Sequence, residues 1–101
     1  MNRREAIESA VRILVPRIPR HELEAVIDHA LGSRGLQTAS PETAAWLSLT
    51  SYIRHRLTDY DDLLNDGYDM ESARFFVLDD MNAVLEEWGS PRRVQVEDES
   101  E

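Results

Sequence analysis

The sequence predicts an all-α protein: a compact bundle of four to five helices followed by a disordered acidic C-terminal tail. Apolar residues recur at spacings of three and four over most of the chain, which is the periodicity of helices with one buried face. Prolines, glycines and capping residues separate these segments. The period of two that is typical of strands occurs only in Val94-Gln95-Val96.

A chain of 101 residues is expected to form one domain, because a second hydrophobic core needs more residues than remain. Its 42% apolar and 31% charged residues are typical of a globular protein. We expect residues 1–91 to be the helical domain. Residues 92–101 end in Glu97-Asp98-Glu99-Ser100-Glu101 and are expected to be a disordered acidic tail.

The first helix is expected from about Arg4 to Leu14, and Pro16 and Pro19 end it because proline lacks the N–H that a helix interior requires. Its apolar face holds Ile7, Val11 and Leu14. A second helix is expected to begin near Pro19 or Arg20 and to end at Gly32. Its apolar stripe holds Leu23, Val26, Ile27, Ala30 and Leu31.

Residues 32–39 contain two glycines and read either as an anion-binding loop or as a plain helix connection. No strand precedes them, which favours the connection. Ser40, Pro41 and Glu42 then give an N-cap, a proline at the first helical position and an acid in the first turn. The third helix should run to about Leu57. Its expected buried side chains are Ala45 or Trp46, Leu49, Ile53 and Leu57.

Thr58 and Asp61 have the spacing of a capping box, which predicts a short fourth helix that ends at Gly67. Asp69 is expected to cap a fifth helix, which Gly89 ends. The fifth helix has the most regular apolar pattern of the chain. Its expected buried residues are Ala73, Phe76, Val77, Met81, Val84, Leu85 and Trp88.

The charge of the chain limits its partners. Twenty acidic residues against eleven basic ones give a formal charge of −9, and all eleven basic residues are arginine. This charge repels nucleic acid at long range and favours a protein with a basic surface. Arginine without lysine fits either recognition of carboxylates and phosphates or a codon bias of the genome.

Several classes of site are not expected. The chain has no cysteine, which excludes disulfides and thiolate chemistry. Its three histidines form no clustered ligand pattern, so we expect neither a metal nor another cofactor. No apolar run is long enough to span a membrane. The N-terminal arginines lead into acidic residues rather than an apolar segment, which indicates a cytoplasmic protein.

The stretch Arg54–Leu64 concentrates the plausible chemistry. His55 and Asp59 are four residues apart, so a continuous helix places them on one face, as for an imidazole that a carboxylate orients for general-base catalysis. The alternative is structural, with caps and with ion pairs between the arginines and nearby acids. We expect Tyr60 to be partly exposed, with Trp46 and Trp88 in the core.

From about Ile18 to Trp88 the chain resembles DUF2293, a family of small bacterial proteins of unknown function. The motifs that carry the resemblance are His29-Ala30, Ser33-Arg34-Gly35-Leu36, Ile53-Arg54-His55, Thr58-Asp59-Tyr60-Asp61-x-Leu63-Leu64, Ala73-Arg74 and Val84-Leu85-x-x-Trp88. The resemblance implies a shared helical domain and draws attention to these positions. The candidate binding residues are Arg34, Arg54, His55, Arg56, Thr58, Tyr60, Asp61 and Arg74.

We therefore expect a small non-enzymatic interaction module that binds a protein through the junction of the third and fourth helices. One alternative is a nucleic-acid-binding protein with an arginine face. That face consists of Arg17, Arg20, Arg34, Arg54 and Arg56. A third hypothesis is a hydrolase-like enzyme that uses His55.

Overall fold

The computed structural model describes residues 1–96. The helices are α1 (Arg3–Leu14), α2 (Arg20–Gly32), a short 3-10 helix (Arg34–Leu36), α3 (Pro41–Leu57), α4 (Tyr60–Asn65) and α5 (Met70–Glu87). The all-α prediction is confirmed: this part of the chain contains five α-helices and no strand. Residues 97–101, for which disorder was expected, lie outside the described residues.

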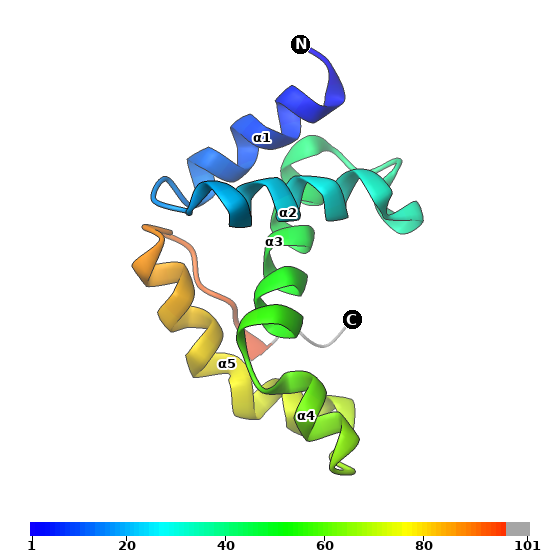
Figure 1. The fold of residues 1–101 in the computed structure, drawn as a ribbon, viewed down its shortest axis with the longest axis vertical. Coiled ribbons are helices and arrows are strands. Elements are labelled where there is room, and N and C mark those ends of the chain that lie inside the picture. Colours follow the sequence, from blue (N-terminus) through cyan, green and yellow to red (C-terminus); the bar gives the residue numbers. More distant parts are fainter. Residues whose placement is uncertain (97–101) are drawn as a thin grey trace.

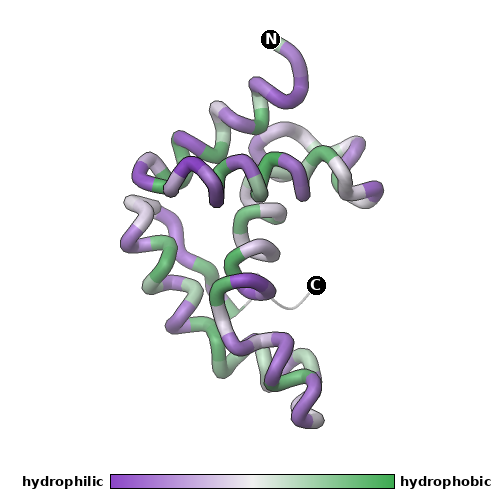
Figure 2. The backbone as a smooth tube through the Cα atoms, in the orientation of Figure 1, coloured by the Kyte–Doolittle hydropathy of each residue, from purple (hydrophilic) through white to green (hydrophobic). Residues whose placement is uncertain are grey.

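The fold is organised around α3, which contacts all four other α-helices (Figure 1). The helices α1 and α2 pack against each other and against α3. The helix α5 also contacts α3, and α4 lies where α3 and α5 approach each other. Along the helices, hydrophobic and hydrophilic residues alternate in short stretches (Figure 2), as expected for helices with one buried face.

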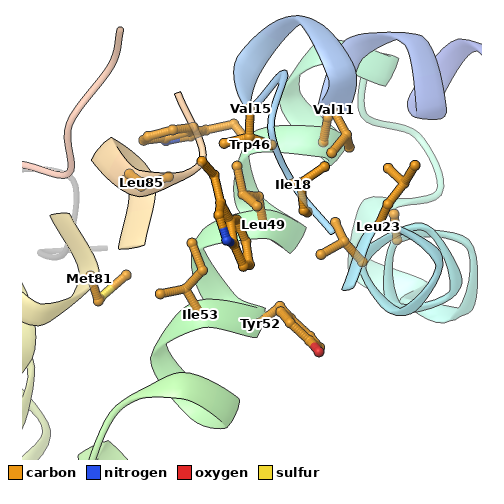
Figure 3. Close-up of a cluster of buried hydrophobic side chains, with 14 of the residues drawn as sticks. Val11, Val15, Ile18, Leu23, Trp46, Leu49, Tyr52, Ile53, Met81 and Leu85 are labelled. Carbon is orange, nitrogen blue, oxygen red and sulfur yellow. The ribbon is translucent and has the colours of Figure 1, made fainter. Parts of the chain in front are cut away.

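The side chains of α3 lie in the middle of one hydrophobic core, between side chains of the α1–α2 pair and side chains of α5 (Figure 3). Leu49 and Ile53 are fully buried, between the α1–α2 pair and α5. Trp46 and Trp88 are 6% and 4% exposed, which confirms the prediction that both lie in the core. Leu57 was expected in the core but is 37% exposed, because it is the last residue of α3.

The predicted helix starts at Ser40 and Asp69 are confirmed. The Ser40 hydroxyl accepts a hydrogen bond from the Thr43 backbone N–H at 3.1 Å. The Asp69 carboxylate accepts one from the Ser72 N–H at 2.7 Å. These side chains satisfy backbone donors that have no partner within the helix, which is why such residues favour this position.

The C-terminal end of α5 is fixed against the α1–α2 connection. Gly89 has φ 89°, a left-handed conformation that ends the helix and that other residues rarely adopt. A Cβ atom at Gly89 would lie 3.1 Å from Nη1 of Arg17. The Arg17 guanidinium donates hydrogen bonds to the carbonyls of Glu86 and Glu87, each at 3.3 Å. Arg17 therefore caps α5 and joins the α1–α2 connection to the C-terminal end of α5.

The packed part of the chain continues past Pro91, where we expected no further packing. Val94 is only 2% exposed. The buried Asn82 side chain accepts a hydrogen bond from the Val94 N–H at 2.7 Å and donates one to the Val94 carbonyl at 3.1 Å. The Arg92 guanidinium lies 3.8 Å from the centroid of the Trp46 ring. Residues 92–96 thus run back over α3 and α5 as a strap.

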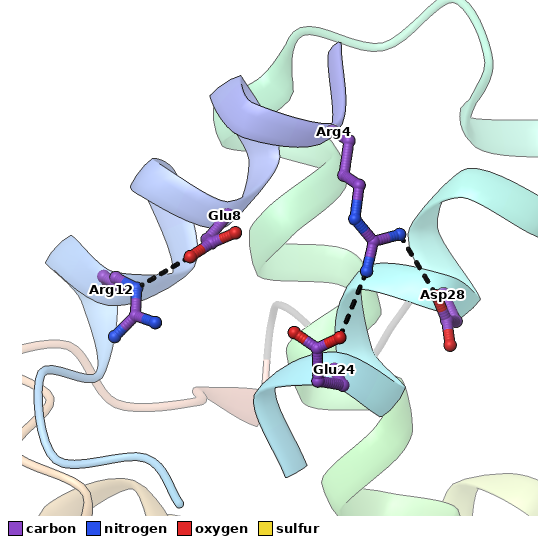
Figure 4. A network of polar contacts seen from close by, with 5 residues as sticks. All are labelled: Arg4, Glu8, Arg12, Glu24 and Asp28. Atoms are coloured by element: carbon purple, nitrogen blue, oxygen red, sulfur yellow. Dashed lines mark hydrogen bonds and ion pairs between the residues drawn. The ribbon is translucent and has the colours of Figure 1, made fainter. Parts of the chain in front are cut away.

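The surface of α1 and α2 carries exposed ion pairs (Figure 4). Arg4 of α1 bridges to Glu24 and Asp28 of α2, each at 3.3 Å. Arg12 pairs with Glu8 at 3.1 Å one turn away. Pairs of this kind contribute up to about 1 kcal/mol each, since water screens them. Because of these ion pairs, the acidic side chains of Glu8, Glu24 and Asp28 already have an arginine partner within the fold.

Candidate functional site

The α3–α4 junction, defined here as residues 54–61, is built around Thr58. Its hydroxyl donates a hydrogen bond to the Arg54 carbonyl at 2.5 Å and accepts one from the Tyr60 N–H at 3.2 Å. The capping box predicted from Thr58 and Asp61 is wrong, because the N-cap position of α4 is Asp59. Thr58 instead ends α3 and orients the first residue of α4.

Tyr60 is the buried centre of the junction, with an exposed fraction of 2%. The prediction of a partly exposed Tyr60 is therefore wrong. Its ring lies 5.7 Å from the Arg54 guanidinium carbon and meets the His55 ring edge-on, with the centroids 5.2 Å apart. Both geometries are favourable for an aromatic ring. Arg54 is also buried, at 9% exposure, so neither residue offers much surface to a partner.

His55 pairs with Asp61 rather than with the expected Asp59. Its Nδ1 lies 2.7 Å from the Asp61 carboxylate. The helix breaks at Thr58, so the four-residue spacing to Asp59 no longer defines a common face. The two side chains are 45% and 56% exposed, and water therefore competes with and screens the pair. The arrangement fixes the imidazole ring but does not place it in the water-excluded environment that strengthens catalytic electrostatics.

Arg56 and Tyr52 connect the end of α3 to α2. The Tyr52 hydroxyl donates a hydrogen bond to the Glu22 carboxylate, and the Arg56 guanidinium lies 5.7 Å from the Tyr52 ring centroid. Burial raises the pKa of Tyr52, and the hydrogen bond to Glu22 and its negative charge raise it further. Tyr52 is thus held as a protonated donor that joins α2 to α3.

The structure does not bring all the predicted site residues together. Arg34 lies in the 3-10 helix after α2, far from α4 (Figure 1). Arg74 is half-buried on α5. Of the predicted site residues at the junction, His55, Arg56 and Asp61 are exposed. They are the predicted residues that a partner can contact at this place.

A cluster of exposed apolar side chains lies beyond the junction, at the start of α5. This aromatic patch consists of Tyr68, Met70, Phe75 and Phe76, with exposed fractions of 46%, 56%, 65% and 56%. The Phe76 ring meets those of Tyr68 and Phe75 edge-on, with centroids 5.5 Å and 6.1 Å apart. The three rings thus form one continuous surface.

The prediction that Phe76 is buried is wrong, and the sequence contains the signal for it. The buried residues of α5 follow a spacing of four from Ala73 through Val77 and Met81. Counted from Ala73, Phe75 and Phe76 lie about 200° and 300° round the helix, whereas the stripe spans roughly the first 80°. Two adjacent aromatic residues outside the buried stripe indicate a surface patch.

Asp69 makes the helix start beside the patch dependent on pH. The backbone and side-chain hydrogen bonds from Ser72 lower the pKa of the Asp69 carboxyl below its ordinary 3.8. Because the folded-state pKa is below the unfolded one, this carboxylate stabilises the fold above pH 3.8. That stabilisation is lost as the pH falls through the lower folded-state pKa.

An Asp69→Asn variant keeps a capping side chain but cannot titrate. We expect the two proteins to have similar melting temperatures at neutral pH. Below about pH 4 the wild type should lose more stability than the variant, because only its cap becomes protonated. Calorimetry of both proteins from neutral to acidic pH measures this difference. A constant difference at all pH values would mean that Asp69 is not a titrating cap.

Two further features bear on the kind of site. Within residues 1–96, no group of three or more His, Asp or Glu side chains is placed to hold a metal ion. None of the described helices is long and apolar enough to cross a membrane.

The fold and the junction define the class of this molecule: a small all-α protein with an architectural helix junction and an exposed aromatic patch. The chain belongs to the DUF2293 family, described as an uncharacterized conserved protein, whose family model matches residues 10–89. The match covers α2 to α5 completely, and of α1 it covers residues 10–14. Neither a curated protein nor a solved structure matches the chain.

Proposed function

We propose that the protein is a non-enzymatic, cytoplasmic interaction module that binds another protein. The partner contacts the end of the molecule formed by the α3–α4 junction, α4 and the first half of α5. The observation that carries the proposal is the aromatic patch, because contiguous exposed apolar side chains are unusual on a protein without a partner. Aromatic residues and methionine are also enriched at protein interfaces.

The junction supports this proposal by holding the surface in place. Thr58 and the buried Tyr60 fix where α4 begins, and α4 packs on α5. His55, Arg56 and Asp61 remain exposed and add polar groups to the contact surface. An apolar patch combined with exposed polar groups is the arrangement of residues found in many binding sites.

The arrangement of the arginines supports a protein partner over nucleic acid. Arg54 is buried, and the Arg17 guanidinium caps the end of α5. Arg20 is the first residue of α2, and Arg34 lies in the 3-10 helix that follows the other end of α2, a helix of 13 residues that is about 20 Å long. Two of the five arginines are thus engaged within the fold, which weakens the basic face that the nucleic-acid hypothesis needs.

The proposal is tested by comparative capture from a lysate of the organism that encodes the protein. The bait is the full chain, either as wild type or as the Phe75→Ser/Phe76→Ser double variant. The matched control is Ile13→Ser, which removes an exposed apolar residue (73% exposed) on α1, away from the patch. Circular dichroism establishes that each bait is folded.

Quantitative mass spectrometry should identify proteins that the wild type and Ile13→Ser retain equally. We expect the double variant to lose them by at least about tenfold, the effect of removing roughly 1.4 kcal/mol of binding energy. Equal retention by all three baits, or loss in Ile13→Ser alone, would overturn the proposal.

A further inference from the structure

The exposed face of α5 has two chemical halves. Phe75 and Phe76 belong to the aromatic patch, and Asp79 and Asp80 follow one turn later. Residues four apart lie on one helical face, so each aromatic side chain has an exposed acid next to it along α5. Glu86 and Glu87 continue the acidic surface to the end of the helix. An apolar patch is thus continued by acidic side chains.

The negative charge of the chain is concentrated in residues 57–88, which include α4 and α5. Residues 57–88 carry ten acidic side chains and one arginine, a formal charge of −9 that equals the value for the whole chain. Residues 1–56 carry eight arginines and six acidic side chains, a formal charge of +2. The single arginine of the acidic region, Arg74, is half-buried. Any partner of α5 therefore approaches a strongly negative surface.

The acids on the exposed face of α5 differ from those on α1 and α2. Glu8, Glu24 and Asp28 are held in ion pairs with arginines of the same region (Figure 4). Within residues 1–96, Asp79 and Asp80 take part in no ion pair. Their negative charge is therefore not neutralised within the described residues, and basic side chains of a partner can pair with them.

We propose that the partner segment is a basic amphipathic peptide. Its apolar side chains pack on Phe75, Phe76 and Tyr68, and its lysines or arginines face the acids of α5. This inference rests on the proposed function and specifies the chemistry of the partner. A second copy that contacts through the same face would bring another negative surface, and nucleic acid would bring phosphates, so both are repelled.

The geometry sets the size of the segment. Phe75 to Glu87 spans about 18 Å along the helix axis, at a rise of about 1.5 Å per residue. A helical partner segment of about 12–15 residues matches this length. The apolar contact supplies most of the affinity, while the charges select the partner and its direction along α5.

The test uses a fluorescein-labelled synthetic peptide of about 15 residues, with leucines at helical spacing and lysines at the other positions. Fluorescence anisotropy measures its binding to the full chain. We expect binding to the wild type to weaken at least about tenfold between about 0.1 M and about 1 M salt, as the Debye length falls from about 10 Å to about 3 Å. A peptide with glutamate in place of lysine should not bind.

Two pairs of substitutions separate the apolar and the charged contributions. Phe75→Ser/Phe76→Ser should abolish binding, and Asp79→Asn/Asp80→Asn should weaken it several-fold and reduce the salt dependence. The control Glu24→Gln/Glu42→Gln changes the net charge equally, but on α2 and α3, and should bind like the wild type. Equal binding by the glutamate peptide, or equal weakening by the control, would overturn the inference.

Two further outcomes distinguish this inference from the proposed function. If no basic peptide binds but the lysate capture still yields a partner that requires Phe75 and Phe76, the proposed function stands and the partner chemistry is wrong. Sedimentation equilibrium tests the remaining occupant. A wild-type dimer that Phe75→Ser/Phe76→Ser dissociates would show that a second copy covers the patch, which also overturns the inference.

Discussion

Replacing Tyr60 with alanine is expected to lower the free energy of unfolding by about 3–5 kcal/mol, the usual cost of removing a large buried aromatic side chain. The ring is 2% exposed and contacts Arg54 and His55, so its loss leaves a cavity where α3 meets α4. A domain of this size has a stability of only about 5–15 kcal/mol. The variant is therefore expected to be close to the limit of folding.

Urea denaturation followed by circular dichroism measures this effect. Tyr60→Phe keeps the ring that packs against Arg54 and His55 and should cost less than about 1 kcal/mol. Tyr68→Ala removes a tyrosine of the exposed patch and should change the stability by only about 0.5 kcal/mol. Equal effects of Tyr60→Ala and Tyr68→Ala would show that the junction is not the packed element described above.

The second large effect is expected for Asn82→Ala. The Asn82 side chain bonds to both the N–H and the carbonyl of Val94, and both residues are buried. Removing it leaves a buried donor and a buried acceptor without partners, which costs about 1–3 kcal/mol for each group unless the segment detaches into water. We expect the free energy of unfolding to fall by about 2–4 kcal/mol in total. Detachment of residues 92–96 limits this loss, because the backbone groups of Val94 then bond to water.

Hydrogen exchange detects the local part of this loss. The Val94 amide should be protected in the wild type and should exchange much faster in Asn82→Ala. The matched control is Asn65→Ala, which removes an exposed asparagine at the end of α4. If Val94 exchanges rapidly in the wild type as well, residues 92–96 do not form a strap in solution.

The helices and their limits are largely predictable from the sequence because the signals are local. Ser40 and Asp69 each bond to a backbone N–H three residues away, and Gly89 supplies the left-handed turn that ends α5. Such interactions depend on short stretches of chain. The apolar periodicity likewise identifies the buried face of α1 and α2, whereas α3 also buries the polar residues Ser48, Thr50 and Arg54.

The incorrect predictions concern residues whose burial depends on contacts with parts of the chain that are distant in the sequence. Tyr60 is buried because α3, α4 and α5 meet around it, and periodicity within one short helix does not reveal that. Val94 is buried because Asn82, twelve residues earlier, satisfies its backbone groups. Phe76 was expected in the core because it lies three residues after Ala73, but the buried stripe of α5 advances by four residues and leaves Phe76 exposed at its edge.

The candidate site in the structure differs from the one expected from the sequence. The stretch that concentrates chemical groups in the sequence contains two buried elements, Arg54 and Tyr60, and an exposed His55–Asp61 pair. The aromatic patch was not predicted as a site, although Phe75 and Phe76 stand out once the buried stripe of α5 is defined. The junction supports the binding surface, and the patch provides most of its apolar area.

The most direct test of the proposed interaction is hydrogen exchange on the complex with a partner that the wild-type chain retains. We predict that amides of residues 66–80 gain protection on binding, while those of α1 and α2 do not change. A partner that protects α1 and α2 and leaves residues 66–80 unchanged would contradict the proposal that the aromatic patch is the binding surface.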